Sequence, residues 1–211
     1  MPDTTLRFPA NVIIEGNLDI AGSQTSRPRS YLTQDNFAAY AITPQQLRIH
    51  DAYATPISAA ASDDLGISTG GTFGTDAPYI SAGDLKAAGA TTRRARFLFT
   101  LPPEYVTAES VRVAVIAGMV TTVADGSCTI DVEAFKTAHT SLASGSDLVT
   151  TALQSINSTS FAEKDFELTS SGLAAGDTMD IRISITCTDT ATVTAVIPAI
   201  GHLWVALDVK G

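Results

Sequence analysis

Few residues of this chain are spaced in a way that supports chemistry. His50 is followed directly by Asp51, and a histidine beside a carboxylate is half of a proton relay. A surface or interface histidine in an irregular segment is the simpler interpretation, which we prefer. The sequence contains no HExxH, GxSxG, phosphate-binding-loop or EF-hand pattern. We therefore predict no catalytic residue, no cofactor and no metal site, and we expect that the protein is not an enzyme.

Aspartates recur in the predicted loops and turns. Carboxylates gathered in the loops of a β-sandwich can hold Ca²⁺. Aspartate is also favoured in turns because its side chain accepts hydrogen bonds from the nearby backbone, and we prefer this interpretation. The positions are Asp63, Asp64, Asp76, Asp125, Asp147, Asp177 and Asp189.

One basic cluster, Arg93-Arg94-Ala95-Arg96, stands out in a chain whose formal net charge is −9. Such a cluster can bind a phosphate or an acidic partner surface. Because the surrounding charge is negative, we prefer a salt-bridge cluster within an assembly. The same acidity repels phosphate backbones and anionic lipids, so we expect neither nucleic acid nor a membrane as a direct partner.

Aromatic side chains could form a sugar-stacking platform, and the candidates are Trp204, Tyr105, Tyr79 and Tyr53. Aromatic residues make up only 7% of the chain, which does not favour such a platform. Trp204 falls on the face opposite the apolar stripe of the last predicted strand. An outward tryptophan fits a subunit interface as well as a ligand site.

Short strands must position these residues, because apolar residues alternate strictly from about residue 95 onward. Many short strands with regular turns between them predict an all-β fold, an antiparallel β-sandwich or jelly roll over residues 95–211. Cys128 and Cys187 fall in two of these strands. They are either buried thiols or a disulfide, and spacing alone does not decide between the two. The apolar positions of the main runs are Phe97, Phe99 and Leu101; Val111, Val113 and Val115; Ile130 and Val132; Phe166 and Leu168; Met179, Ile181, Ile183 and Ile185; and Leu203, Val205, Leu207 and Val209.

The first 94 residues lack this regularity, apart from one β-segment over residues 11–22. We expect residues 1–25 to form an N-terminal β-arm and residues 26–94 a long, mostly irregular arm rich in Pro, Gly, Ser and Ala. Within the second arm, residues 37–42 suggest a short helical turn capped by Asp35 or Asn36. Residues 43–49 suggest another turn, with Pro44 at its first position.

Three stretches of the chain resemble a known family. GNLDIAGSQTSRPRSYL resembles the β-arc and linker at the N-termini of trimeric structural proteins of tailed bacteriophages. ARFLFTLPPEY and AAGDTMDIRISITCTDTA are similar to strands of the C-terminal sandwich in phage virion proteins, including decoration (cement), head-fibre and fibre-like proteins. The resemblance implies a homotrimer with a jelly-roll domain, attached to a capsid or tail through its arm. We expect the protein to be made in the host cytoplasm and located in the virion. It carries over no catalytic residue.

The resemblance makes a viral structural protein the leading expectation, namely a homotrimeric capsid decoration protein. Its partners would be copies of itself and the major capsid protein or other virion proteins, and its arm would bind and stabilise the shell. The alternative is a short tail fibre or a receptor- or carbohydrate-binding module. A polysaccharide depolymerase would need two acids in a cleft, and the sequence does not specify such a pair. The expected interface residues are Val12, Ile14, Leu18, Ile20, Arg27, Arg29, Phe37, Tyr40, Ile42, Arg93, Arg94 and Trp204.

Overall fold

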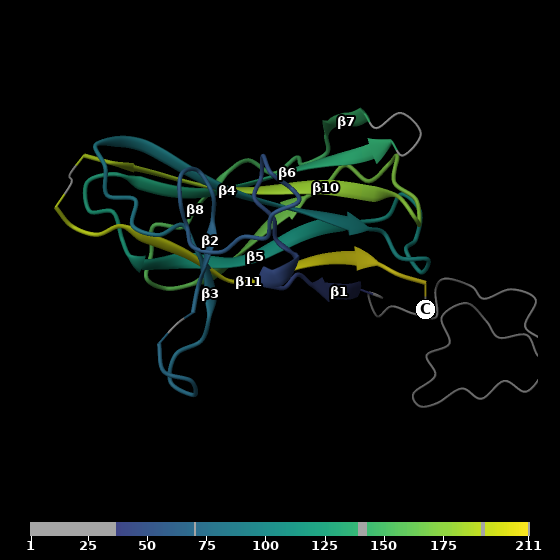
Figure 1. Cartoon of the computed structure of the whole chain (residues 1–211). Helices are drawn as coiled ribbons and strands as arrows, with labels where there is room; N and C mark the ends of the chain where they lie inside the picture. Colours follow the sequence, from purple (N-terminus) through teal and green to yellow (C-terminus); the bar gives the residue numbers. More distant parts are fainter. Residues whose placement is uncertain (1–36, 70, 139–142, 191–192, 211) are drawn as a thin grey trace, which may run out of the picture. The chain divides into compact units, whose positions relative to one another are not determined.

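The computed structural model describes residues 37–69, 71–138, 143–190 and 193–210 (Figure 1). All of them belong to one compact unit, residues 35–211. The predicted β-arm lies outside the described residues, together with Val12, Ile14, Leu18, Ile20, Arg27 and Arg29. No helix among the described residues is long and apolar enough to cross a bilayer.

Two antiparallel sheets face each other and form a β-sandwich, which confirms the predicted all-β fold class (Figure 1). The first sheet, called the β5 sheet here, has the order β2-β3-β11-β5-β9, and β1 also pairs with β11. Its strands are β1 (Phe37–Ala41), β2 (Gly66–Ser68), β3 (Tyr79–Ser81), β5 (Val111–Thr121), β9 (Ala162–Glu167) and β11 (Ile197–Asp208).

The second sheet, called the β10 sheet here, has the order β4-β10-β6-β7, and β8 also pairs with β6. Its central strand β10 pairs along its whole length with β4 on one side and, from Met179 to Thr188, with β6 on the other. The strands are β4 (Gly89–Thr100), β6 (Ser127–Ala138), β7 (Ala143–Asp147), β8 (Gln154–Ser155) and β10 (Thr178–Asp189).

The core lies between the two sheets, and the predicted alternation places the expected side chains in it. Along β10, Met179, Ile181, Ile183 and Ile185 are fully buried, whereas the residues between them point away from the core. Burying each of these side chains contributes roughly 1.5–3 kcal/mol, so a sandwich core of this size stabilises itself. The predicted inward valines of β5 are also fully buried.

Residues 37–94 take a larger part in the sandwich than their sequence suggests. Strands β1, β2 and β3 come from this range and join the β5 sheet, and the isolated apolar residues Leu47, Ile57, Leu65 and Leu85 are buried in the core. The expected boundary near residue 94 therefore does not separate the described elements. These short strands gain their order from pairing and packing with distant residues, which local patterns do not report.

The two turns predicted after residue 36 have different outcomes. The helical turn over residues 37–42 is wrong, because Phe37–Ala41 is strand β1, paired antiparallel with β11. Alanine favours helices, but here cross-strand hydrogen bonds to β11 outweigh that local preference. The second turn is confirmed as a 3₁₀ helix, Pro44–Gln46, which begins at Pro44.

Cys128 and Cys187 form a disulfide, which decides between the two alternatives left by the sequence. The two cysteines lie directly opposite each other on β6 and β10, with Cα atoms 4.1 Å apart. Both are fully buried. The bond links residues 59 positions apart and joins β6 to β10, two of the strands that form the outer face of this sheet.

Candidate functional site

The outer face of the β10 sheet is polar across three neighbouring strands. Residues directly opposite each other in an antiparallel pair point to the same face of the sheet. The register therefore places Arg94, Ser184 and Asp131 in one row across β4, β10 and β6. Arg182 and Glu133 lie in the adjacent row. These rows give the face alternating charged groups and hydroxyls.

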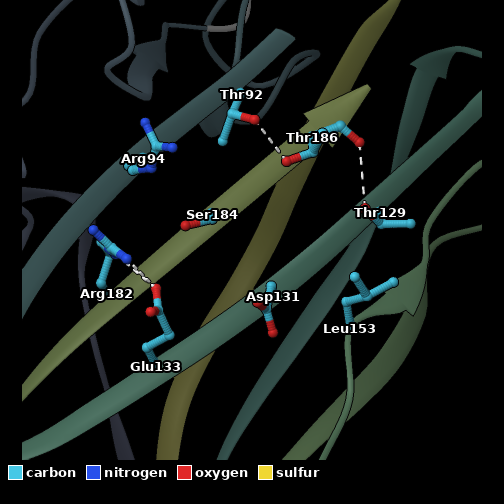
Figure 2. Close-up of a pocket in the computed structure, with 9 residues that line it drawn as sticks. All are labelled: Thr92, Arg94, Thr129, Asp131, Glu133, Leu153, Arg182, Ser184 and Thr186. Atoms are coloured by element: carbon cyan, nitrogen blue, oxygen red, sulfur yellow. Dashed lines mark hydrogen bonds and ion pairs between the residues drawn. The ribbon is translucent and has the colours of Figure 1, made fainter. Parts of the chain in front are cut away.

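A groove of about 280 Å³ lies on this face (Figure 2). Eight of its nine lining residues are polar or charged, and Leu153, which precedes β8, adds an apolar side chain that is 58% exposed. The lining residues are Thr92, Arg94, Thr129, Asp131, Glu133, Leu153, Arg182, Ser184 and Thr186.

Hydrogen bonds within the groove fix several of these side chains. The hydroxyls of Thr92 and Thr186 are 2.8 Å apart across β4 and β10, and Thr129 Oγ1 donates to the Thr186 carbonyl at 3.4 Å. Arg182 Nε donates to Glu133 Oε2 at 2.7 Å (Figure 2). Because both partners are ionised, this is one of the stronger contacts of the face. The groove thus offers preorganised hydroxyl and charged groups.

Asp131 differs from the other charged groups of the groove. Among the described residues it has no salt bridge, and its Oδ1 accepts a hydrogen bond from the Val132 backbone N–H at 3.0 Å. Burial raises the pKa of Asp131 above its ordinary value, and the nearby carboxylates of Glu133 and Asp147 act in the same direction, against the smaller opposing effects of the Val132 hydrogen bond and of Arg182. Arg94, Glu133 and Arg182 each form a salt bridge, so Asp131 is the one charged lining residue without a salt bridge among the described residues.

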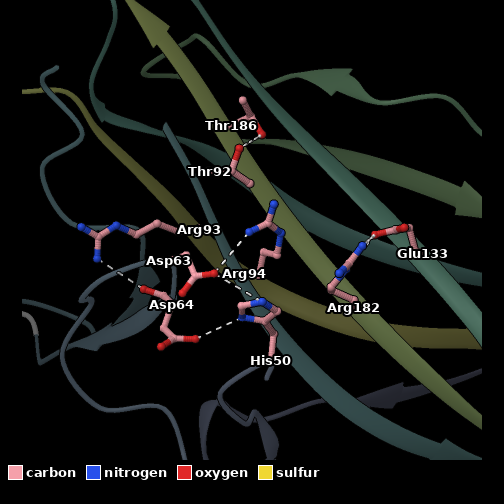
Figure 3. A network of polar contacts seen from close by, with 9 residues as sticks. All are labelled: His50, Asp63, Asp64, Thr92, Arg93, Arg94, Glu133, Arg182 and Thr186. Atoms are coloured by element: carbon pink, nitrogen blue, oxygen red, sulfur yellow. Dashed lines mark hydrogen bonds and ion pairs between the residues drawn. The ribbon is translucent and has the colours of Figure 1, made fainter. Parts of the chain in front are cut away.

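Two loop segments run along the free edge of β4 and bring further charges to one end of the groove. Backbone hydrogen bonds join Arg48 to Arg96 and Asp63 to Arg94, which places the loop residues beside the arginines of β4. The edge of β4 is thereby covered, as sheet edges in natural proteins commonly are. The result is a network that continues from the groove (Figure 3).

His50 lies at the centre of this network. Its Nδ1 is 3.3 Å from Asp64 Oδ1, and its Nε2 is 3.4 Å from Asp63 Oδ2 (Figure 3). Asp63 also contacts Arg94, at 3.4 Å from Nη1. Ligand atoms of His50, Asp51 and Asp64 lie within 4.8 Å of one another, which is close enough for one cation. Because both ring nitrogens already face carboxylates, we assign His50 a structural role in holding the loops.

The predicted arginine cluster is engaged within the chain. Arg96 forms a bidentate pair with Asp180 and lies 5.2 Å from the centroid of the Tyr53 ring. Arg94 contacts Asp63, and Arg93 Nη1 donates to the Asp64 carbonyl at 3.5 Å. The interface role assigned to Arg93 and Arg94 stays a prediction.

Three of the predicted interface residues lie in β1 or directly after it. Ile42 is buried in the core, and Tyr40 packs edge-on against Phe99 with ring centroids 5.8 Å apart. Phe37 is 44% exposed, and Arg112 lies over its ring. Their role in an interface also stays a prediction.

Trp204 points outward from the β5 sheet, on the face predicted for it. The register places it between Ala41 of β1 and Ala114 of β5, so small residues flank the indole on both sides.

Tyr105 is fully buried, and its hydroxyl donates to the Glu109 carbonyl at 2.6 Å. Tyr53 instead covers Arg96 on the other sheet, so the four predicted aromatic residues form no common platform.

Several of the recurring aspartates have the turn role expected for them. Asp177 Oδ2 accepts from the Ala174 N–H at 2.8 Å, and Asp76 Oδ2 accepts from the Thr72 N–H at 3.0 Å. For these residues the turn interpretation is confirmed.

Sequence reasoning missed most of the groove. Asp131, Glu133, Arg182, Ser184 and Thr186 occupy the outward positions of strands that were correctly predicted. That pattern identifies them as surface residues. It does not reveal that β4 and β6 flank β10, which is what gathers them into one site.

Comparisons with known proteins identify no family. No family model and no curated protein matches the chain. One similar solved structure is the N-terminal part of endo-1,4-β-D-xylanase 10B from Clostridium thermocellum complexed with xylohexaose, at 11% identity and a TM-score of 0.40. That match covers 72% of this chain and 25% of the xylanase chain.

Two further solved structures show the same low level of similarity. The CBM22-1 xylan-binding domain of Xyn10C from Paenibacillus barcinonensis has 9% identity and a TM-score of 0.43, and the match covers 82% of this chain and 100% of that domain. The infectious bursal disease virus Gx strain structure has 12% identity and a TM-score of 0.37, covering 84% and 33%. These values indicate no ligand or partner, so we argue function from the residues of the groove.

Proposed function

We propose that this protein is a non-catalytic binding module that takes up a glycan in the groove of the β10 sheet. The groove itself carries the proposal, because hydroxyls, guanidinium groups and carboxylates alternate along it. A glycan has many hydroxyls that each donate and accept, and such a lining can satisfy them. The exposed side chain of Leu153 provides an apolar contact for the C–H face of a sugar ring.

A substitution that fills the groove tests this proposal. Ser184 lies on the central strand of the groove and points away from the core, so Ser184→Gln adds a neutral side chain without disturbing the packing. We expect at least about a tenfold loss of glycan affinity by isothermal titration calorimetry, because the new side chain displaces the ligand. Ala39→Gln, on an exposed position of the other sheet, is the matched control. Unchanged affinity in Ser184→Gln contradicts the proposed site.

The same samples distinguish binding from hydrolysis. Asp131 and Glu133 both line the groove, and two carboxylates are the minimum for glycoside cleavage. Glu133 is engaged by Arg182, and we expect the bound oligosaccharide to stay intact. Release of shorter products that disappears in Glu133→Gln would make the protein a hydrolase instead.

A virion structural role is a second candidate, and the surface around Trp204 favours it. An outward tryptophan flanked by alanines is suited to a subunit interface, since aromatic residues are enriched there. Light scattering on the full chain would then give a mass near three chains. Ala41→Arg, at an exposed position beside Trp204, should lower it to one chain. A wild-type monomer would count against this candidate.

A further inference from the structure

The charges that line the groove are unequally compensated. Arg182 donates to Glu133 at 2.7 Å, so that guanidinium is already paired with a carboxylate inside the groove. Arg94 contacts Asp63 at 3.4 Å, and its charge is shared with a carboxylate at the groove's end. Neither arginine is therefore an open anion site. An acidic ligand would have to compete with a carboxylate already in place.

When Arg94 is counted with Asp63 and Arg182 with Glu133, the charge that remains in the groove is that of Asp131. Asp131 forms no salt bridge within the part of the chain that the structure describes, and its pKa is raised by burial and by Glu133 and Asp147, an effect that Arg182 and the Val132 hydrogen bond only partly offset. A carboxylate in such surroundings gains from any ligand group that donates a hydrogen bond or carries positive charge. An anionic group placed there would meet repulsion instead, and the net charge of −9 adds to it.

We infer that the groove selects neutral or amino-bearing glycans over glycans that carry carboxylate or sulfate groups, and that Asp131 sets this preference. The inference rests on the proposed glycan-binding function and specifies its ligand class. Ligand hydroxyls or ammonium groups donate to the Asp131 carboxylate, while the hydroxyls of Thr92 and Ser184 contact the rest of the sugar.

A glycan array probed with the full chain tests the inference. The array holds neutral, amino-bearing and anionic glycans built on the same sugar backbones, and it is read at low ionic strength, where charge effects are largest. We expect anionic members to bind about tenfold more weakly than their neutral counterparts, which is the size of one charge–charge contact near a surface. In Asp131→Asn the difference should shrink severalfold. Asp125→Asn, in the exposed turn between β5 and β6, removes the same charge at a position that does not line the groove and should preserve the difference.

The outcomes separate this inference from the function on which it rests. If anionic glycans bind as well as neutral ones, the charge preference is wrong and the glycan-binding function stands. If the preference persists in Asp131→Asn, another group sets it and the role of Asp131 is overturned. If the wild-type chain binds no glycan of any charge, the proposed function fails and this inference fails with it.

Discussion

Two arginines on the outer faces of the two sheets have the same kinds of partner but different surroundings. On the β10 sheet, Arg96 binds both carboxylate oxygens of Asp180 and lies 5.2 Å from an aromatic ring. On the β5 sheet, Arg112 donates to one oxygen of Asp165 at 3.2 Å and lies 5.6 Å from an aromatic ring. The Asp180 side chain is only 11% exposed, whereas that of Asp165 is 38% exposed.

The difference shows how each sheet uses its outer face. The loop residues His50 and Tyr53 contact Arg96. Each nitrogen and each carboxylate oxygen of the Arg96–Asp180 pair has a partner, through the bidentate contact and the donation from Arg96 to the His50 carbonyl. On the β5 sheet, Arg112 Nε and Asp165 Oδ1 have no hydrogen-bond partner among the described residues. The β10 sheet thus holds a fixed polar surface suited to a polar ligand. The β5 sheet presents small and aromatic residues around Trp204.

The largest effect should come from the disulfide, which lies within the β10 sheet alone. Replacing Cys128 and Cys187 together by alanine removes a link across 59 residues, and we expect a loss of about 4 kcal/mol in the free energy of unfolding. Urea denaturation measures it, and wild-type protein treated with dithiothreitol should lose a similar amount. A loss below about 1 kcal/mol would show that strand pairing alone holds this sheet.

Replacing Arg96 and Arg112, one at a time, tests the comparison between the two sheets directly. Arg96→Met leaves the Asp180 carboxylate largely buried and unpaired, so we expect a loss of about 2 kcal/mol in the free energy of unfolding. Arg112→Met leaves the carboxylate of Asp165, whose side chain is 38% exposed, and the expected loss is about 0.5 kcal/mol. Equal losses in urea denaturation would mean that the two faces do not differ as described.

A smaller effect should come from a glycine that shapes the surface of the β5 sheet. A Cβ added to Gly118 would lie 2.9 Å from the Phe161 ring, so Gly118→Ala must displace that ring. We expect a loss of about 1 kcal/mol in the free energy of unfolding. Gly145→Ala on β7 of the other sheet is the control, because its nearest contact would be an ordinary 3.7 Å. Equal effects of the two substitutions would contradict close packing at Phe161.

The two regions of the chain also differ in how far the sequence predicts them. From residue 95 onward, strict alternation of valines and isoleucines locates the strands and the side chains that face the core. Before residue 95, β2 and β3 are only three residues long, and buried residues such as Leu47 stand alone in loops. Such residues are ordered by distant contacts, and a local pattern cannot report these contacts.

The candidate site is likewise only partly predictable from local sequence patterns. Alternation predicts that Arg182 and Ser184 face away from the core, and Asp131 and Glu133 occupy equivalent positions on β6. Neither the order β4-β10-β6 nor the pairing of Cys128 with Cys187 can be read from spacing, because each depends on register between segments far apart in the chain.

The smallest expected effect concerns Asp131, and its sign is the informative part. Because its pKa is raised in the folded protein, the unfolded chain releases this proton at lower pH, and the ionised carboxylate therefore lowers folded-state stability at neutral pH. Asp131→Asn should then increase the free energy of unfolding at pH 7 by on the order of 0.5 kcal/mol, the usual scale of a surface substitution. At pH well below 3.8, where the carboxyl is protonated in both the folded and the unfolded state, this gain should vanish.

Asp125→Asn is needed as the control, because removing any negative charge from a chain of net charge −9 reduces repulsion. The gain in Asp131→Asn should exceed that of the control at pH 7. On this account the Asp131 carboxylate lowers the stability of the ligand-free protein but improves its discrimination between ligands. Such a trade-off is common at binding sites, because residues selected for function often lower stability. If Asp131→Asn is instead less stable than wild type at pH 7, the carboxylate supports the fold, and the groove loses its distinguishing feature.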